Sequence, residues 1–412
     1  MHEPSSAGSA SPAFIVRAAD VADLDRLLEI HVAAFPDPRP SEVRRRTFLY
    51  NRLGGFEHLR VVEHAGDVIA HAFSFPITGW FGGRAVQGSA IASVGVAPES
   101  RGRGVASALL AALHDEAATR GDAFTILYPF RQGFYSRLGY GPVARYRVHE
   151  LSPRAIPAAW RGAGRGIVRR AEPHDRRELA RVYLEAAQRG TGFIERQGSA
   201  WQHDLLDERR HWLVIDHAGS LDGYTSFTLH QSEPHARVRA QVHEVLARDD
   251  SARRQLLGAL GSLGDQIADL TIALADDDPL DLAFIDGDRN RAGTAEVEHP
   301  VGVVGTGPMI RLIHARAALL ARGYTSDGAV NLAIDGERAF GLDVERGVAR
   351  VASAQGRVTL HTTSNALGSV AFGGIGLGPA CRLGWIGPTD ADALRSASRL
   401  LRLGPFFSLD VF

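Results

Sequence analysis

A run of fourteen residues, 93–106, has the composition of an anion-binding turn between a strand and a helix. Glycine at positions 102 and 104 lets the backbone approach a ligand without interference from a β carbon. The free N–H groups of such a turn and of the following helix N-terminus bind anions. Arg101 and Arg103 add positive charge. The segment therefore predicts a pyrophosphate site, with an ordinary basic strand-to-helix turn as the alternative.

The elements that must position this turn form an alternating series over residues 14–150. Two helices are expected, one begun by Asp20 as its N-cap and one ended by Gly121. The helices cover 21–35 and 105–119, and apolar runs predict strands at 14–17, 59–63, 68–75, 85–96 and 124–128. This alternation predicts an α/β domain at 14–150, preceded by a disordered tail at 1–13.

Two motifs in this domain are similar to those of a known enzyme family. The pattern Arg101-x-x-Gly104-x-Ala106 resembles the pyrophosphate signature of the GNAT acetyltransferases: Arg or Gln, two residues, Gly, one residue, then Gly or Ala. The stretch Phe134-Tyr135-x-x-x-Gly139-Tyr140 resembles the GNAT sequence F-Y-x-x-x-G-F. The resemblance implies acetyl-CoA as co-substrate and Tyr135 as the acid that protonates the leaving thiolate. The alternative for Tyr135 is a packing aromatic.

The rest of the 412-residue chain is long enough for one or two further domains. Residues 151–300 repeat the first pattern loosely, because 167–171 matches 15–19 and each is followed by a predicted helix. Ser251-Ala252-Arg253-Arg254 stands where the first copy has its glycine turn, so the second copy is predicted to be structural.

Residues 301–412 differ in kind from the first two parts. We expect a helix at 310–321, then a meander of strands at 331–334, 340–344 and 348–351, and later helices. The glycine-rich run 367–381 is expected to form strands and turns of a buried sheet. The fold class is thus α/β and α+β.

The whole-chain order resembles the Eis (enhanced intracellular survival) branch of the GNAT family over residues 14–412. The motif at 93–106, Tyr135 in its setting and the final Phe412 carry the resemblance. It implies two tandem GNAT-like domains, a sterol-carrier-protein-like domain at 301–412, and a homo-oligomer that is a hexamer. It also implies that the α-carboxylate of Phe412 accepts the amine proton, where filling an apolar gap is the alternative. The coenzyme-contacting residues are then Val94, through its N–H to the thioester oxygen, and Val96, Arg101, Gly102, Arg103, Gly104, Val105 and Ala106.

The acceptor is expected to be an amine on a small molecule or a lysine: an aminoglycoside-like polycation, a polyamine or a lysine side chain. A cationic acceptor needs acidic groups, and Asp37 and Glu42 lie in the stretch that borders GNAT substrate sites. Competing interpretations are a lipid or sterol-carrier-like binding protein with a vestigial acetyltransferase, and a coenzyme A-sensing regulator. The intact turn and Tyr135 argue against the first, and the lack of a DNA-binding element argues against the second.

Composition limits the partners further. Formal net charge is −1, which gives no reason to expect nucleic acid or an anionic membrane. The 17 histidines form no metal-binding motif, so no metal is expected. A single cysteine, Cys381, fits a reducing cytoplasm.

Overall fold

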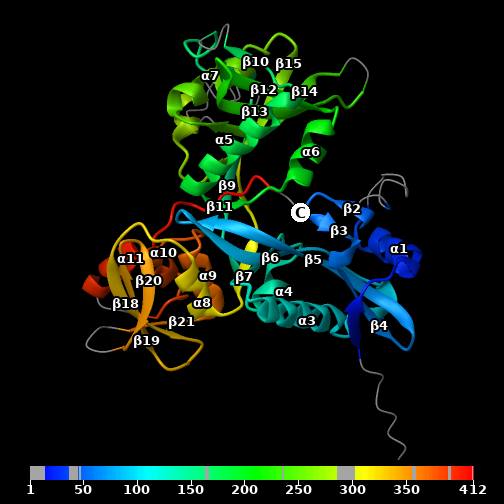
Figure 1. Ribbon diagram of the computed structural model, residues 1–412, viewed down its shortest axis with the longest axis vertical. Coiled ribbons are helices and arrows are strands. Elements are labelled where there is room, and N and C mark those ends of the chain that lie inside the picture. Colours follow the sequence, from blue (N-terminus) through cyan, green and yellow to red (C-terminus); the bar gives the residue numbers. More distant parts are fainter. Residues whose placement is uncertain are drawn as a thin grey trace, which may run out of the picture.

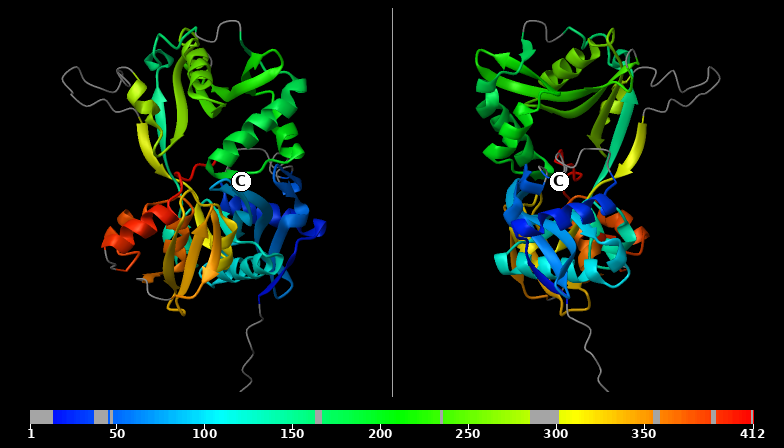
Figure 2. Two further views of the ribbon diagram at one scale, coloured as in Figure 1. Left: turned by 60° about the vertical axis from the view of Figure 1, so that its left-hand side comes forward. Right: turned by 90° about the vertical axis from the view of Figure 1, so that its right-hand side faces the viewer.

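The computed structural model describes residues 14–36, 45, 48–162, 167–233, 236–284, 302–354, 359–387, 391–410 and 412 (Figure 1). The predicted tail at 1–13 lies outside the described residues. Three sheets of four or more strands organise these parts. The views in Figure 2 show the second domain stacked on the first, with the C-terminal segment running between them.

The first sheet has eight strands in the order β1-β4-β5-β6-β7-β17-β8, and β11 pairs with β5. The strands are β1 (Ile15–Ala18), β4 (Leu59–His64), β5 (Asp67–Phe81), β6 (Arg84–Val96), β7 (Phe124–Leu127), β17 (Met309–Leu312), β8 (Gly141–Pro142) and β11 (Thr191–Ile194). Only β6 and β7 are parallel among the first five strands, as a helical crossover requires. A two-stranded ribbon, β2 (Tyr50–Asn51) and β3 (Gly54–Gly55), lies outside this sheet.

Helices α1 (Leu24–Ala34) and α3 (Val105–Arg120) cover opposite faces of this sheet. Before α1, the side chain of Asp20 accepts from the Ala22 N–H, as the predicted N-cap should. α1 packs Leu27 and Ile30 on the face that carries Phe73, whereas α3 packs on the other face. Both predicted helices and the predicted strands of this domain are confirmed.

The second sheet has the order β10-β12-β13-β14-β15-β9-β16. The strands are β10 (Val168–Arg170), β12 (Arg210–His217), β13 (Ser220–His230), β14 (Val238–Ala247), β15 (Ile267–Ala275), β9 (Arg145–Leu151) and β16 (Gly302–Thr306). Helices α5 (Arg176–Arg189), α6 (Gly198–Leu206) and α7 (Asp250–Gly261) belong to this domain. Its first five strands repeat the directions of the first sheet, with β14 and β15 as the parallel pair.

The two domains also share a local ion-pair pattern. Arg17 of β1 binds Asp23, six residues later, and Glu63 of β4. Arg169 of β10 binds Asp175, again six residues later, and a carboxylate of β12. The same element order and the same pairing at the same place confirm the predicted duplication.

The division between domains differs from the predicted one at both boundaries. β9 crosses position 150 and pairs with β15, so it belongs to the second sheet. β16 pairs with β9, after which β17 enters the first sheet between β7 and β8. The helix predicted at 310–321 is therefore wrong in its first turn, and α8 is limited to Ala315–Ala321. The apolar side chains that suggested a helix, those of Met309, Ile310 and Leu312, are instead buried in the first sheet.

The third part has the sheet order β20-β19-β18-β21, formed by β18 (Gly328–Ile334), β19 (Phe340–Glu345), β20 (Val348–Ala352) and β21 (Thr359–Thr362). The predicted meander is confirmed. The glycine-rich run is not a buried sheet, because it forms α9 (Ser364–Ala371) and α10 (Leu377–Arg382), and α11 (Ala391–Leu401) follows. Glycine at 368 lets α9 approach β17, since a β carbon there would lie 3.2 Å from Ile310. No helix within the described residues has both the length and the apolar composition to span a bilayer.

Candidate active site

The strands β6 and β7 separate at the centre of the first sheet. They pair only through Gly88–Ile91 and Phe124–Leu127, although β6 continues to Val96. A bulge lies at this point, because the register between β5 and β6 shifts and Ser93 has a φ of 50°. In the described structure no strand pairs with β6 on this side beyond Ile91. Val94 and Val96 thus lie along an open strand edge, whose N–H and C=O groups can pair with an extended ligand.

The glycine turn lies at the far end of this edge. Gly102 and Gly104 have φ values of 76° and 82°, a region that favours glycine. A β carbon on either would meet no atom within 4 Å, so the space before the turn is open. Gly104 is the N-cap of α3 and contributes no side-chain cap, which leaves the first N–H groups of Val105 and Ala106 for a ligand.

The two arginines of the turn differ in what they contact. Arg101 donates to the carbonyl oxygens of Val96 and Ala33, at 3.2 Å each. It therefore ties the turn to the end of β6 and to α1. The Arg103 Nη2 lies 3.0 Å from the ring Nε2 of His64. The predicted pyrophosphate residues are brought together, and Arg101 fixes their backbone as well as supplying charge.

Tyr135 lies on the short helix α4 (Gln132–Ser136), which follows β7. It is only 2% exposed and belongs to the same apolar cluster as Val94, Val96 and Val105. Burial raises the pKa of Tyr135 to about 12, so its hydroxyl is a proton donor at neutral pH. The structure thus brings the predicted acid into one cluster with the open strand edge.

A hydrogen-bonded group behind Tyr135 supports this cluster. Tyr140 is fully buried, and its hydroxyl lies 2.9 Å from both His114 Nε2 and Thr125 Oγ1. His114 is also buried, and desolvation lowers its pKa to about 3. The Tyr135 and Tyr140 rings are in edge-to-face contact, so the hydrogen-bonded Tyr140 helps to fix the orientation of Tyr135.

The C-terminal segment returns to the end of β7. The Tyr128 hydroxyl, one residue beyond β7, donates to the backbone oxygen of Asp410 at 3.0 Å. The Phe412 ring lies 5.2 Å from the Tyr128 ring, centre to centre. Phe412 is half-buried at the junction of the first two domains. The predicted terminal residue therefore lies beside the end of β7, the strand that separates from the open edge of β6.

The ion pairs that hold the C-terminal segment in place were not predicted from the sequence. Asp410 is 1% exposed and lies in a closed ring of alternating charges, called the ion ring here. Every adjacent pair in the ring is within 3.2 Å: Arg52–Asp410, Asp410–Arg196, Arg196–Glu244, Glu244–Arg210, Arg210–Asp204 and Asp204–Arg52. The three positive and three negative charges balance. The sequence offered one signal of this ring, because Asp410 is an acid within the otherwise apolar tail Leu409–Phe412.

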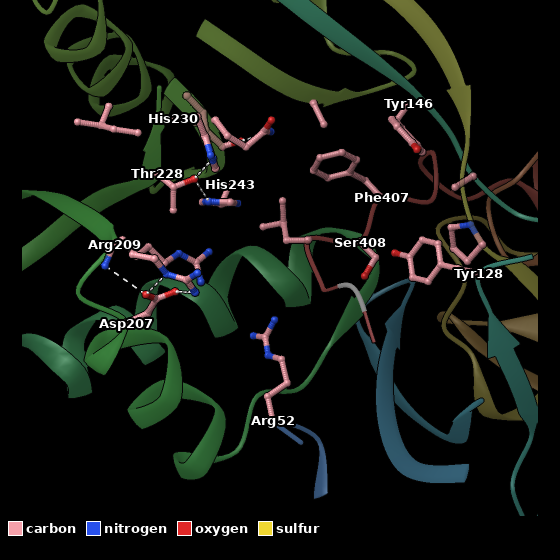
Figure 3. Close-up of a pocket in the computed structure, with 18 residues that line it drawn as sticks. Arg52, Tyr128, Tyr146, Asp207, Arg209, Thr228, His230, His243, Phe407 and Ser408 are labelled. Carbon is pink, nitrogen blue, oxygen red and sulfur yellow. Dashed lines mark hydrogen bonds and ion pairs between the residues drawn. The ribbon is translucent and has the colours of Figure 1, made fainter. Parts of the chain in front are cut away.

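A cavity of about 660 Å³ lies between the two sheets, next to Tyr128 (Figure 3). It is called the interdomain cavity here. Its walls come from β9, β12, β13, β14 and β15, from Tyr128 just after β7, and from the C-terminal segment. Its residues include Arg52, Tyr128, Tyr146, Asp207, Arg209, Arg210, Leu229, His230, His243 and Phe407. Its volume fits a drug-sized molecule.

Two stretches of the chain match known acetyltransferase domains. A family model described as an acetyltransferase (GNAT) domain matches residues 15–143, and a second model with that description matches 192–312. The N-acetyltransferase Eis of Mycobacterium tuberculosis is 27% identical over 335 residues, which is 77% of each chain. The chain belongs to the GNAT acetyltransferases.

Solved structures show the same fold for this GNAT acetyltransferase. A GCN5-related N-acetyltransferase from Anabaena variabilis matches with a TM-score of 0.83 and 22% identity, covering 97% of this chain and 100% of its own. Eis1 from Mycobacterium abscessus matches with a TM-score of 0.76 and 23% identity, with the same coverage. The three-part arrangement is therefore shared with an Eis protein.

The second GNAT domain has no comparable cradle in its described residues. Asp249 is the N-cap of α7, and its carboxylate accepts from the Ala252 N–H, where Gly104 in the first domain leaves such groups open. Arg253 forms an ion pair with Asp278. Phe407 and Leu409 of the C-terminal segment line the gap between β14 and β15, which retains a cavity of only about 160 Å³. Capping and filling together disfavour a coenzyme there.

The predicted acceptor-binding acids, Asp37 and Glu42, lie outside the described residues. Among the residues that are described, no group of three or more His, Cys, Asp or Glu side chains is placed to hold a metal ion.

Proposed function

We propose that the chain is an acetyl-CoA-dependent N-acetyltransferase that acts on a primary amine through its first domain. One observation carries the proposal: the open edge of β6 leads directly to the uncapped glycine turn. A pantetheine chain has amides that suit a strand edge, and a pyrophosphate suits the turn. The contacting residues proposed are Val94, Val96, Arg101, Gly102, Arg103, Gly104, Val105 and Ala106.

The proposed chemistry is direct attack of the neutral amine on the thioester carbonyl. The N–H of Val94, on the bulged edge, would donate to the developing oxyanion. A preorganised donor of this kind contributes on the order of 3 kcal/mol. Tyr135 would give its proton to the sulfur as the carbon–sulfur bond breaks. Its buried hydroxyl and its position in the cluster with Val94 support this role.

The amine proton must leave as the new bond forms, and we assign its acceptor to the α-carboxylate of Phe412. The proposal applies to a chain that ends at Phe412. The ion ring supports it, because Asp410 fixes the backbone two residues before the terminus. An α-carboxylate is a weak base, with an ordinary pKa of about 3.5, so transfer through a water molecule suits it best.

The resemblance to Eis supports a sterol-carrier-like third domain and a hexameric homo-oligomer. The single cysteine, Cys381, supports a cytoplasmic location. A lipid-carrier function is not favoured, because the strand opening, the turn and Tyr135 are all formed in the first domain.

Thiol release tests the proposed function directly. Acetyl-CoA is mixed with the full chain and with each of a set of amines, and free thiol is followed over time. We expect amine-dependent release for at least one acceptor. Release that stays at the amine-free rate for every amine would contradict the proposal.

A further inference from the structure

The interdomain cavity carries a distinctive charge pattern. Its described lining contains three arginines, Arg52, Arg209 and Arg210, but only one carboxylate, that of Asp207. A site for a polycation needs several carboxylates, because each ammonium group loses hydration on binding. The lining therefore lacks the carboxylates that a polycation site needs.

The single carboxylate is already committed to a neighbour. Arg209 donates to both oxygens of Asp207, at 2.8 and 2.9 Å. This guanidinium holds the pKa of Asp207 below its usual value, so the pair is a closed salt bridge. Arg52 and Arg210 are members of the ion ring, in which three acids balance three arginines. No described carboxylate of the lining is left over for a ligand.

The rest of the lining carries no formal negative charge, and it combines aromatic and aliphatic side chains with the polar residues Thr228, Gln241 and Ser408 and two histidines. Thr228 Oγ1 lies between His230 Nε2 at 2.9 Å and His243 Nε2 at 3.0 Å (Figure 3). Burial and the nearby Arg210 lower the pKa of His243 to about 4, so its ring is neutral at physiological pH. Aromatic side chains from three other segments complete the wall, namely Tyr128, Tyr146 and Phe407.

The sequence around the predicted acceptor acids follows the same trend. Within residues 37–47, Asp37 and Glu42 are outnumbered by the four arginines at 39, 44, 45 and 46. That stretch adds no net negative charge, whatever its placement. Neither the lining nor this stretch supplies the acids that a polyamine or an aminoglycoside would require.

From this pattern we infer that the acceptor is a primary amine with a single positive charge and an aromatic body, an arylalkylamine, bound in the interdomain cavity. The inference rests on the proposed function and names its substrate class. The aromatic walls accept a flat apolar body and attract one ammonium group. Tyr128 directly follows β7 and lines the cavity, so the cavity reaches the end of β7, where the open edge of β6 begins.

Acceptor preference is the first test. Thiol release is measured with 2-phenylethylamine, spermine, kanamycin and a lysine-containing peptide at fixed acetyl-CoA. We expect kcat/KM for 2-phenylethylamine to exceed that of each other amine by about tenfold or more, in the range that apolar pockets discriminate. A preference for spermine, kanamycin or the peptide would overturn the inference while leaving the proposed function in place. If none of the four amines gives thiol release, the proposed function itself is contradicted, and the inference that rests on it fails as well.

A charge inserted in the wall is the second test. Leu229 lines the cavity near the end of β13 and is 42% exposed, so Leu229→Asp should fold. We expect it to raise kcat/KM for spermine about tenfold, as one added carboxylate pairs with one ammonium. The KM for acetyl-CoA should not change. Leu282→Asp is the matched control, since Leu282 is 87% exposed and does not line the cavity. Equal behaviour of the two variants toward spermine would place the acceptor elsewhere and overturn the inference.

Discussion

Removal of one charge from the ion ring should loosen the C-terminal segment. In Asp410→Asn the side chain keeps its size but loses its negative charge. The carboxylate accepts from Arg196 Nε at 2.8 Å and from the Tyr183 hydroxyl at 2.7 Å, and it pairs with Arg52 at 3.0 Å. The side chains of Asp410 and Arg196 are 2% and 1% exposed, so water does not replace the lost charge.

The magnitude follows from this geometry. Removing one partner from a buried ion pair costs about 3–5 kcal/mol, because a charge is left uncompensated. Arg196 keeps Glu244 and Arg52 keeps Asp204, so the lower end, about 3 kcal/mol, is expected. A loss of about 3 kcal/mol lowers the Tm of a domain of about 150–250 residues by roughly 6–12 °C. The measurement is a thermal melt of both proteins at neutral pH.

The pH dependence has a definite sign. Burial opposes the charge on Asp410, but Arg196 and Arg52 outweigh it and hold its pKa below the usual value. A lowered pKa stabilises the fold above the unfolded value of about 3.9, and that stabilisation is lost as pH falls through the folded pKa. The difference in Tm between the two proteins should therefore be full near neutral pH and shrink below about pH 4.

An exposed ion pair gives the control for this experiment. Asp265 pairs with Arg154 at 3.3 Å, and their side chains are 89% and 68% exposed. Asp265→Asn should leave Tm unchanged, because exposed pairs contribute little. If Asp410→Asn melted together with this control, the ion ring would not hold the C-terminal segment.

Two further variants address the chemical step. Tyr135→Phe should lower kcat by about 100-fold while the KM for acetyl-CoA changes little, because the hydroxyl acts only as the thiolate leaves. With the pKa of Tyr135 raised to about 12, the wild-type kcat should show no alkaline fall up to about pH 10. A kcat within about threefold of wild type would make Tyr135 a packing residue. Deletion of Phe412, or a C-terminal tag, should depress kcat at unchanged acetyl-CoA affinity, whereas an N-terminal tag should be harmless. Equal steady-state kcat for native, tagged and shortened chains would leave Phe412 with a packing role.

Local features of the first domain were predictable from the sequence. The glycine turn, the N-cap at Asp20 and the helix after Gly104 depend on neighbouring residues, and periodicity and turn chemistry report such features. Placement of Tyr135 near the turn followed from the family motif. The repeated spacing of Arg17 to Asp23 and Arg169 to Asp175 was a further local signal of duplication that the sequence offered.

Features that depend on distant partners were not predictable in the same way. β9 and β16 lie in the second sheet, whereas β17 lies in the first. The residues of these strands do not indicate which sheet each strand joins. Apolar residues at 309–312 fit a helix or a strand equally well until the neighbouring strands are known. The ion ring joins residues from Arg52 to Asp410, so one sequence cannot show which charges pair.

The central claim is that the glycine turn of the first domain, and no other site, binds acetyl-CoA. It is tested most directly by calorimetric titration of acetyl-CoA into wild type, Gly104→Glu and Gly121→Glu. Gly121 is the matched control, because it caps the other end of α3 with a φ of 81° and open space around it. Both variants carry the same backbone strain, but only Gly104→Glu places a side chain and a negative charge at the turn. We expect one site per chain in wild type and in Gly121→Glu, and no binding by Gly104→Glu. Two sites per chain in wild type, or full binding by Gly104→Glu, would contradict the claim.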